Sequence, residues 1–291
     1  MLSVDQVDLV AARILGGGAG PARTADLPRY LDEVRDIDAA DIADANVKHV
    51  SNYGFQVKDL PAVERISRSE DVRRAFAGFV FRLGRVGSAA SDLWSAIARI
   101  SDNGSALGMR HQVHVLFSGN VTAERFEDDL ANANRVAEAT LAALCAGNVD
   151  LYFDTFEDVD RGYFVRTGLV DRRYNPRLAA RVLRNLNAAL PNLQAGGTDG
   201  AIASARNLAG GRVLSGRLAQ DRFWLVLPEP RCQLTALADA DSAGEVTLSL
   251  LVVDLGSGAL ALRRGKASDD GYVLDEPLFA ESPLLAVPRQ P

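Results

Sequence analysis

The sequence predicts an α/β protein in two parts: about four βα units in residues 1–196, followed by a small antiparallel β-sandwich in residues 197–291. Up to about residue 190, short apolar runs alternate with helical segments, which is typical of βα units and a parallel sheet. Beyond a stretch rich in Gly, Asn, Gln and Thr, the helical period disappears. Short aliphatic runs separated by Pro, Gly and Asp-Asp-Gly then indicate a sandwich.

The first two units are predicted from weaker patterns than the last two. The run Val7–Leu15 ends in three glycines and precedes a predicted helix at Pro28–Arg35, although this run is also compatible with a helix. The β-rich run 47–55 (VKHVSNYGF) predicts the second strand. Two helices are expected after it, Ser69–Phe81 and Ser88–Ile100, and the Ser-Glu-Asp start of the former suits the positive end of a helix dipole.

The third unit begins with a predicted strand at His111–Phe117. Asp128 or Asp129 then caps a long alanine-rich helix, which Gly147 ends at the usual C′ position.

The fourth strand, 148–153 (NVDLYF), follows at once and opens into an acidic loop. A last helix is expected to start at Asn175-Pro176, with Pro in the first turn, and to end at Pro191.

The β-rich part contains four apolar runs that predict strands, with a hairpin turn expected at 254–258. These runs are 221–228 (DRFWLVLP), 245–255 (EVTLSLLVVDL), 259–264 (ALALRR) and 283–287 (PLLAV).

Composition excludes several classes of protein. The chain has 291 residues, 47% of them hydrophobic and 24% charged, with a net charge of -6, which are values of a globular protein. A pI near 5.2 without a basic cluster argues against a nucleic-acid partner. No apolar run is long enough to span a membrane. The acidic N-terminus does not resemble a signal peptide, so the chain as written is expected in the cytoplasm, unless an N-terminal portion is missing.

The acidic loop after the fourth strand holds the main candidate site residues, because ligands of parallel α/β folds meet the carboxyl ends of strands. Carboxylates there can bind sugar hydroxyls, act as acid or base, or hold a cation, and an aromatic ring can stack on a sugar. The alternative interpretation is an acidic surface loop neutralised by nearby arginines. The candidates are Asp154, Glu157, Asp158, Asp160, Arg161 and Tyr163.

Metal, redox and nucleotide chemistry find little support. His111 and His114 are three apart on a strand, so they face opposite sides and cannot share one metal ion. Cys145 and Cys232 have no metal or redox spacing and are interpreted as buried thiols. The glycine run at 16–20 lacks the dinucleotide-binding register, although a nucleotide-binding α/β enzyme stays open as a third hypothesis. No metal and no cofactor are expected.

Residues 148–186 resemble the eighth βα unit of clan A glycoside hydrolases, most closely the family of β-xylosidases and α-L-iduronidases. The matching residues are Tyr152-Phe153-Asp154-Thr155-Phe156, Gly168-Leu169 and Asn175-Pro176-Arg177. The helix opened by Asp128-Asp129 is compatible with the seventh unit of that family. The run 47–55 resembles its sixth strand, where a His or Asn near an aromatic lines the sugar cleft.

The resemblance implies the second half of a (β/α) TIM-type barrel with an appended sandwich, acting on O-glycosidic bonds of poly- or oligosaccharides by the retaining route. It also implies that a sugar is bound by His49, Asn52, Tyr53 and His114, in addition to the loop residues. His49 and His114 are alternatively packing histidines.

Two departures qualify this. Strand seven of the family carries the nucleophilic Glu, whereas His111–Phe117 has none; Glu124, in the following loop, is the nearest candidate nucleophile, with Glu157 as the acid. A closed barrel needs eight strands. The missing half is therefore expected from a second copy or a separate chain, unless the segment is the remnant of a split or truncated gene. The alternative function is a non-catalytic carbohydrate-binding or scaffold protein.

Overall fold

The computed structural model describes twelve stretches of the chain. They are 55–70, 73, 77–84, 92–117, 125–154, 156–160, 165–166, 168–190, 200–218, 221–237, 246–267 and 272–289. Within them, no helix is long and apolar enough to cross a membrane. The first predicted unit and most of the run 47–55 lie outside these stretches.

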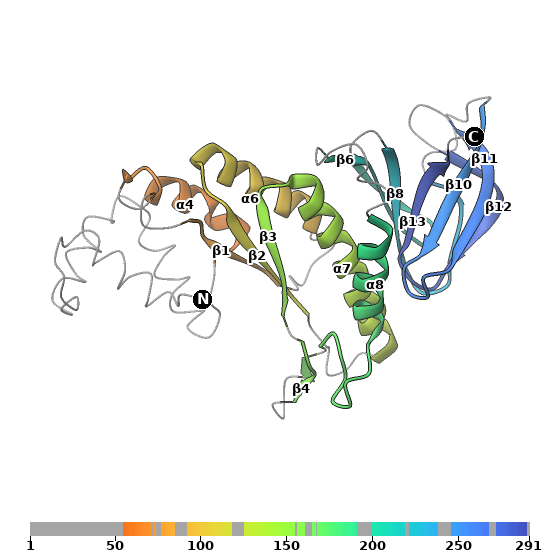
Figure 1. Cartoon of the computed structure of the whole chain (residues 1–291), viewed down its shortest axis with the longest axis horizontal. Helices are drawn as coiled ribbons and strands as arrows, with labels where there is room; N and C mark the ends of the chain where they lie inside the picture. The colour runs from red at the N-terminus through yellow and green to blue at the C-terminus, as the bar shows by residue number, and fades with distance from the viewer. Residues whose placement is uncertain are drawn as a thin grey trace. The chain divides into compact units, whose positions relative to one another are not determined.

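A three-stranded parallel sheet has the order β1-β2-β3 (Figure 1). Its strands are β1 (Val80–Leu83), β2 (His111–Leu116) and β3 (Val149–Asp154). The amides of Arg110 and Gln112 donate to the carbonyls of Ala77 and Phe79, so the two strands run in the same direction. Phe55 forms a parallel bridge to Phe81 on the other side of β1. The spatial order therefore follows the chain order, as it does where helices connect neighbouring parallel strands.

Strand β1 corrects the end of the helix expected at Ser69–Phe81: Glu70 and Arg73 are helical, whereas Val80 and Phe81 belong to the strand. Phe79, Phe81 and Leu83 are buried, whereas Val80 and Arg82 are half-buried, and this period of two is that of a strand. The helical elements before it include a short 3-10 turn, η1 (Val57–Asp59), and α4 (Leu60–Ile66).

Three predicted helices are present with shifted ends. The helix α6 (Leu93–Leu107) continues seven residues past the expected Ile100. The helix α7 (Arg125–Ala146) contains Asp128 and Asp129 rather than being capped by them. Gly147 ends it at a φ of 75°, as expected of a C′ glycine.

The last of these helices, α8 (Leu178–Ala189), starts two residues after Pro176 with Arg177 as its N-cap, so the Pro is outside the helix.

The β-rich part forms one antiparallel sheet of eight strands in the order β6-β7-β8-β13-β10-β11-β12-β9, and this sheet curls (Figure 1). All four predicted strands are present; β6, β7, β9 and β12 add to them. The bounds are β6 (Gly200–Leu208), β7 (Gly211–Leu218), β8 (Asp221–Pro228), β9 (Cys232–Ala236), β10 (Val246–Asp254), β11 (Leu260–Ala267), β12 (Tyr272–Ala280) and β13 (Leu284–Arg289).

Strand β8 is buried on both faces. Phe223 and Leu225 belong to a hydrophobic cluster shared with α7 and α8, while Trp224 and Val226 belong to a second cluster formed with β9, β10 and β12. A strand that is buried on both faces has a continuous apolar sequence, and DRFWLVLP therefore predicts β8. Burial of each such side chain stabilises the fold by about 1.5–3 kcal/mol.

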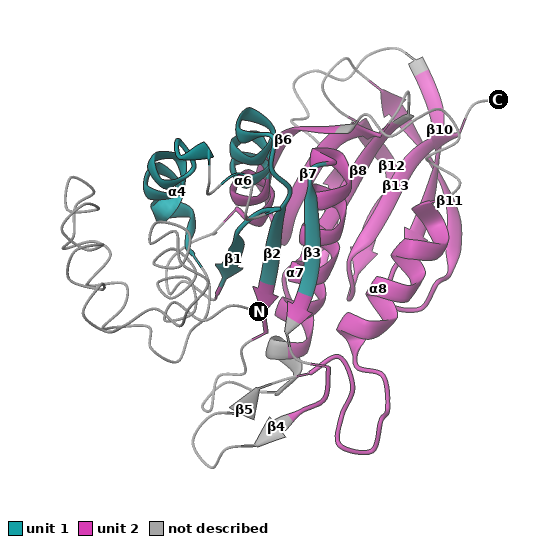
Figure 2. Ribbon diagram, turned by 60° about the vertical axis from the view of Figure 1, so that its left-hand side comes forward, with its two compact units in different colours: residues 1–83, 98–114, 148–152 teal, residues 84–97, 115–147, 153–291 magenta. Residues whose placement is uncertain are grey.

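The chain forms two compact units (Figure 2). One contains residues 1–83, 98–114 and 148–152; the other contains 84–97, 115–147 and 153–291. In the second unit, α7 and α8 pack on each other and on the β6–β8 portion of the sheet. The predicted mixture of a parallel βα part and an antiparallel β part is thus present. The boundary expected near residue 197 lies outside the described residues.

Candidate functional site

The acidic loop after β3 is partly described, and it lies in the second unit. Glu157 and Asp158 are described with their side chains. Asp154 ends β3 and Asp160 lies in β4 (Val159–Asp160), but only their backbone is described. The remaining predicted site residues of the loop, Arg161 and Tyr163, lie outside the described residues, as do Glu124, His49, Asn52 and Tyr53.

The backbone around Glu157 is held against the segment that leads to α8. The Asp158 amide donates to the Val170 carbonyl at 3.1 Å, and the Val170 amide donates to the Phe156 carbonyl at 2.9 Å. Gly168 lies so close that a Cβ there would be 2.5 Å from the Glu157 carbonyl carbon. Only glycine permits this approach, so the contact defines the position of the Glu157 backbone. Strands β4 and β5 (Val165–Arg166) form a short hairpin between the two segments.

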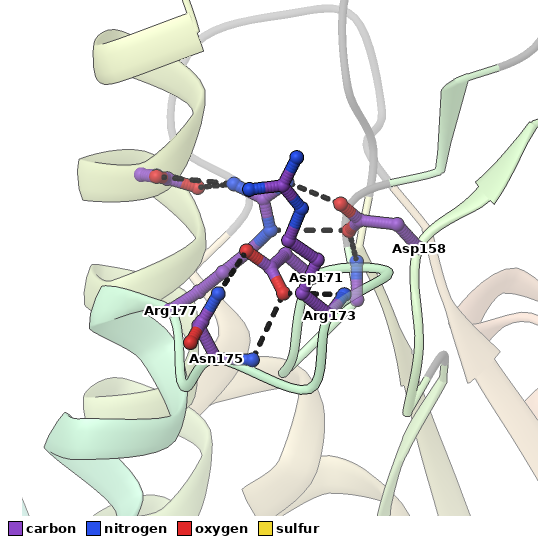
Figure 3. A network of polar contacts seen from close by, with 7 residues as sticks. Asp158, Asp171, Arg173, Asn175 and Arg177 are labelled. Carbon is purple, nitrogen blue, oxygen red and sulfur yellow. Dashed lines mark hydrogen bonds and ion pairs between the residues drawn. The ribbon is translucent and has the colours of Figure 1, made fainter.

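Arg177 joins two carboxylates in this region (Figure 3). Its Nε donates to Asp158 Oδ1 at 3.1 Å, its Nη2 pairs with Asp158 Oδ2, and its Nη1 donates to Asp129 Oδ1 at 3.3 Å. Asp158 Oδ1 also accepts from the Gly168 amide at 2.7 Å. The hydrogen bonds to Asp158 are the main cause of a raised pKa of Arg177. Its guanidinium therefore links the loop after β3 to the start of α7.

A tight turn precedes α8 and is organised by Asp171. Its Oδ1 accepts from the amides of Arg173 and Asn175, both at 2.8 Å, and its Oδ2 accepts from Asn175 Nδ2 at 2.9 Å (Figure 3). The bonds from Asn175 are the main cause of a lowered pKa of Asp171. Tyr174, at the tip, has a φ of 61° and is 65% exposed. Non-glycine residues are held in this conformation only by their surroundings, here by Asp171.

Two carboxylates of the loop are in different states: Asp158 is paired with Arg177, whereas Glu157 can contact a ligand. Asp158 is engaged by Arg177 and Gly168, and these contacts give it a role in holding the loop. The half-buried Glu157 carboxylate has no hydrogen bond or ion pair to any residue that the structure describes. A carboxylate in this state can accept hydrogen bonds from sugar hydroxyls or exchange a proton.

The two histidines of β2, His111 and His114, face opposite sides of the strand, as predicted. The residues that they contact lie in the same compact unit, the one that contains residues 1–83. His111 is fully buried: its Nδ1 accepts from the Phe79 amide at 3.1 Å and its Nε2 pairs with Asn103 Oδ1 at 3.0 Å. Burial lowers the pKa of His111 to about 4. His114 is half-buried and contacts the ring of Tyr152, with a centroid separation of 5.1 Å. His111 is therefore a packing histidine.

The residues that the structure describes contain no group of three or more acidic, His or Cys side chains placed to hold a metal ion. Cys145 and Cys232 are free; Cys232 is buried as predicted, whereas Cys145 is half-buried. Desolvation nevertheless raises the pKa of the Cys145 thiol to about 12. A thiol with such a pKa stays protonated at neutral pH and is a poor nucleophile.

Arg177 and Gly168 were not among the predicted site residues. Both stood in the matched segments Asn175-Pro176-Arg177 and Gly168-Leu169, but their partners are not evident from the sequence. A charged residue at a helix start, followed by an apolar period, is the signal that would have drawn attention to Arg177.

Comparisons with known proteins yield structural likenesses only. No protein-family model matches the chain. No curated protein matches it either. Solved structures of glycoside hydrolases are similar to it at low identity. A family 39 glycoside hydrolase from the gut symbiont Bacteroides cellulosilyticus WH2 is 14% identical, with a TM-score of 0.37, and the match covers 62% of this chain and 34% of that one.

Two further structures are similar over more of the chain. A 4-O-α-L-rhamnosyl-β-D-glucuronidase from Fusarium oxysporum 12S is 12% identical over 94% of this chain and 66% of that one, with a TM-score of 0.47. An α-amylase from Geobacillus thermoleovorans is 13% identical over 90% and 64%, with a TM-score of 0.39. The chain thus spans less than two thirds of each of these three proteins. TM-scores below 0.5 carry no functional assignment.

Proposed function

We propose that the chain is a glycoside hydrolase-like protein that acts on O-glycosidic bonds of oligo- or polysaccharides at the loop after β3. The observation that supports this most is the Glu157 carboxylate, held by its backbone at the carboxyl end of a parallel strand and left without a partner among the described residues. The resemblance of residues 148–186 to the last βα unit of clan A glycosidases supports the same site.

In this proposal Glu157 is the general acid and Glu124 the nucleophile of a retaining reaction. The two carboxyl groups of a retaining glycosidase lie about 5–5.5 Å apart, so the proposal requires this distance between the carboxyl groups of Glu157 and Glu124. Asp154, Asp158, Asp160, Arg161 and Tyr163 surround the sugar. His49, Asn52, Tyr53 and His114 remain predicted sugar contacts on the preceding strands.

Aryl glycosides provide the test of catalysis. Glu124→Gln and Glu157→Gln are expected to lose most of the turnover, because each removes one of the two required carboxyl groups. Glu281→Gln, an exposed glutamate between β12 and β13, is the matched control and is expected to keep full turnover. Unchanged turnover in both site variants would remove these assignments.

We also propose that the protein acts as part of a larger barrel. The sequential order of Phe55, β1, β2 and β3 is that of half of a (β/α) TIM-type barrel, and eight strands are needed to close one. The other half comes from a second copy, from a separate chain, or from further sequence of the same protein. Light scattering on the purified protein is expected to give the mass of a dimer if the second copy supplies it; a monomer directs the search to a separate partner chain.

A second candidate is a non-catalytic carbohydrate-binding or scaffold protein. It is favoured by the sequence of β2, which has no glutamate, and by the Asp158 carboxylate, which Arg177 already neutralises. It predicts that oligosaccharides raise the melting temperature by mass action while no reducing ends are released.

A further inference from the structure

The loop that carries Glu157 depends on one ion-paired cluster. Arg177, three quarters buried, contributes three donor nitrogens to Asp158 and Asp129, and these two side chains are 15% and 27% exposed. Asp158 follows Glu157 directly in the chain. The contacts that hold Asp158 therefore act on the backbone next to Glu157.

Other hydrogen bonds hold the backbone around Glu157 together with Arg177. The Gly168 amide donates to the same Asp158 oxygen that accepts from Arg177 Nε. The Arg177 amide donates to the Leu169 carbonyl at 2.9 Å, next to Val170, which bonds both neighbours of Glu157. Side chain and backbone of Arg177 thus hold both segments between which Glu157 is fixed.

We infer that Arg177 is a positioning residue for Glu157: it holds the backbone from which that carboxylate extends, without contacting substrate itself. This inference rests on the proposed function, in which Glu157 is the acid. The planar guanidinium is suited to the task because it bonds a carboxylate through two parallel donors, which sets direction as well as distance.

The first measurement is amide hydrogen exchange in the full chain, which does not depend on activity. Arg177→Gln is expected to accelerate exchange of the Asp158 and Val170 amides about tenfold or more, because their carbonyl partners are no longer held in place. Arg181→Gln, an exposed arginine one turn further along α8, is the matched control and is expected to leave these amides unchanged. If Arg177→Gln exchanges at the wild-type rate, the inference is wrong whatever the activity.

The second measurement separates positioning from general stability. Below the melting temperature of each variant, Arg177→Gln is expected to lower kcat on aryl glycosides by about a hundredfold with KM within about twofold, because a misplaced acid slows chemistry more than binding. Arg177→Lys, which keeps the charge but not the paired donors, is expected to recover part of kcat. Wild-type kcat in a folded Arg177→Gln protein would overturn the inference.

Asp158→Asn serves if Arg177→Gln does not fold, since it weakens the same pair and leaves Arg177 with Asp129. It is expected to accelerate exchange of the Val170 amide in the same way, and a wild-type exchange rate would contradict the inference. A wild-type protein without turnover on any aryl glycoside would refute hydrolysis, whereas the exchange experiment would still decide whether Arg177 holds the Glu157 backbone.

Discussion

Glu138, buried in the middle of α7, accepts hydrogen bonds from the guanidinium of Arg212 on β7 at 3.2 Å. Arg212 also pairs with Asp92 at 2.6 Å, and Glu138 accepts from the Trp94 amide at 3.1 Å. Burial raises the pKa of Glu138, although Arg212 acts in the opposite direction. This pair ties the helical layer of the second unit to its antiparallel sheet.

Removing one partner of this pair is expected to be costly. Arg212→Met leaves a buried carboxylate without its cation, and we expect it to lower the free energy of unfolding by about 3 kcal/mol or more. The double variant Glu138→Leu with Arg212→Met is expected to lose less than the sum of the two single variants, since no unpaired charge remains. The free energy of unfolding of the wild type, the two single variants and the double variant is measured by urea denaturation. Additive losses would contradict the coupling.

Acid is expected to destabilise the first unit through His111. The pKa of His111 is lowered from 6.5 to about 4 in the folded protein, so the unfolded chain binds more protons between these values. Stability is therefore complete above about pH 6.5 and falls on acidification toward pH 4, by up to about 3 kcal/mol.

His111→Gln isolates this effect, because an amide keeps an acceptor and a donor but does not titrate. We expect a lower stability with a flatter pH dependence in this window, measured by denaturant unfolding at several pH values. Gln112→Ala, a half-buried position next to His111 on β2 that does not titrate, is the control with the wild-type slope. A wild-type slope in His111→Gln would assign the titration to another group.

Gly168→Ala is expected to disturb the loop directly. The added Cβ would lie 2.5 Å from the Glu157 carbonyl carbon, and backbone has to move to relieve the overlap. We expect a loss of about 1–3 kcal/mol in unfolding free energy. Gly84→Ala is the control, because its Cβ would meet only the Leu116 side chain at 3.7 Å. Equal stability of the two variants would argue against the close approach.

The β10–β11 turn is expected to depend on a single side chain of α8. Asn185 Nδ2 donates to the Leu255 carbonyl at 2.9 Å, and Asp254 organises the turn through the amides of Gly256 and Ser257. Asn185→Leu leaves the carbonyl without its donor, at an expected cost of about 1–3 kcal/mol. Asn187→Leu, exposed on the same helix, is expected to cost much less. The two melting temperatures test this, and similar values would contradict it.

Strands that are buried on one face or on both faces can be predicted from the sequence. The five apolar residues Phe223–Leu227 predict β8 because they pack into two clusters, and the alternation in β2 predicts a half-buried strand. The sequence predicts the first two residues of β1, Val80 and Phe81, as the end of a helix, because the strand has only four residues and follows a helical segment. Strand β6 was overlooked because it consists mainly of small and polar residues, whose position in the sheet is set by pairing with β7.

The contacts within the candidate site are harder to predict from the sequence. The acidic loop was located correctly after β3, since its residues follow a recognisable strand. The partners of its charges were not predictable: Arg177 lies 19 residues from Asp158 and 48 from Asp129, and only the packing of α7 and α8 brings them together. Asp158 was expected to bind a sugar, whereas in the structure it binds Arg177, and its contact with a sugar stays a prediction.

The most direct test of the proposed function is a titration of the full chain with xylo-, cello- and manno-oligosaccharides, followed by the backbone amide chemical shifts. The proposal predicts saturable shifts at Glu157, Asp158 and the Gly168–Val170 segment, which Glu157→Gln weakens. Saturable shifts confined to other parts of the chain, or no shifts with any of these sugars, would contradict it.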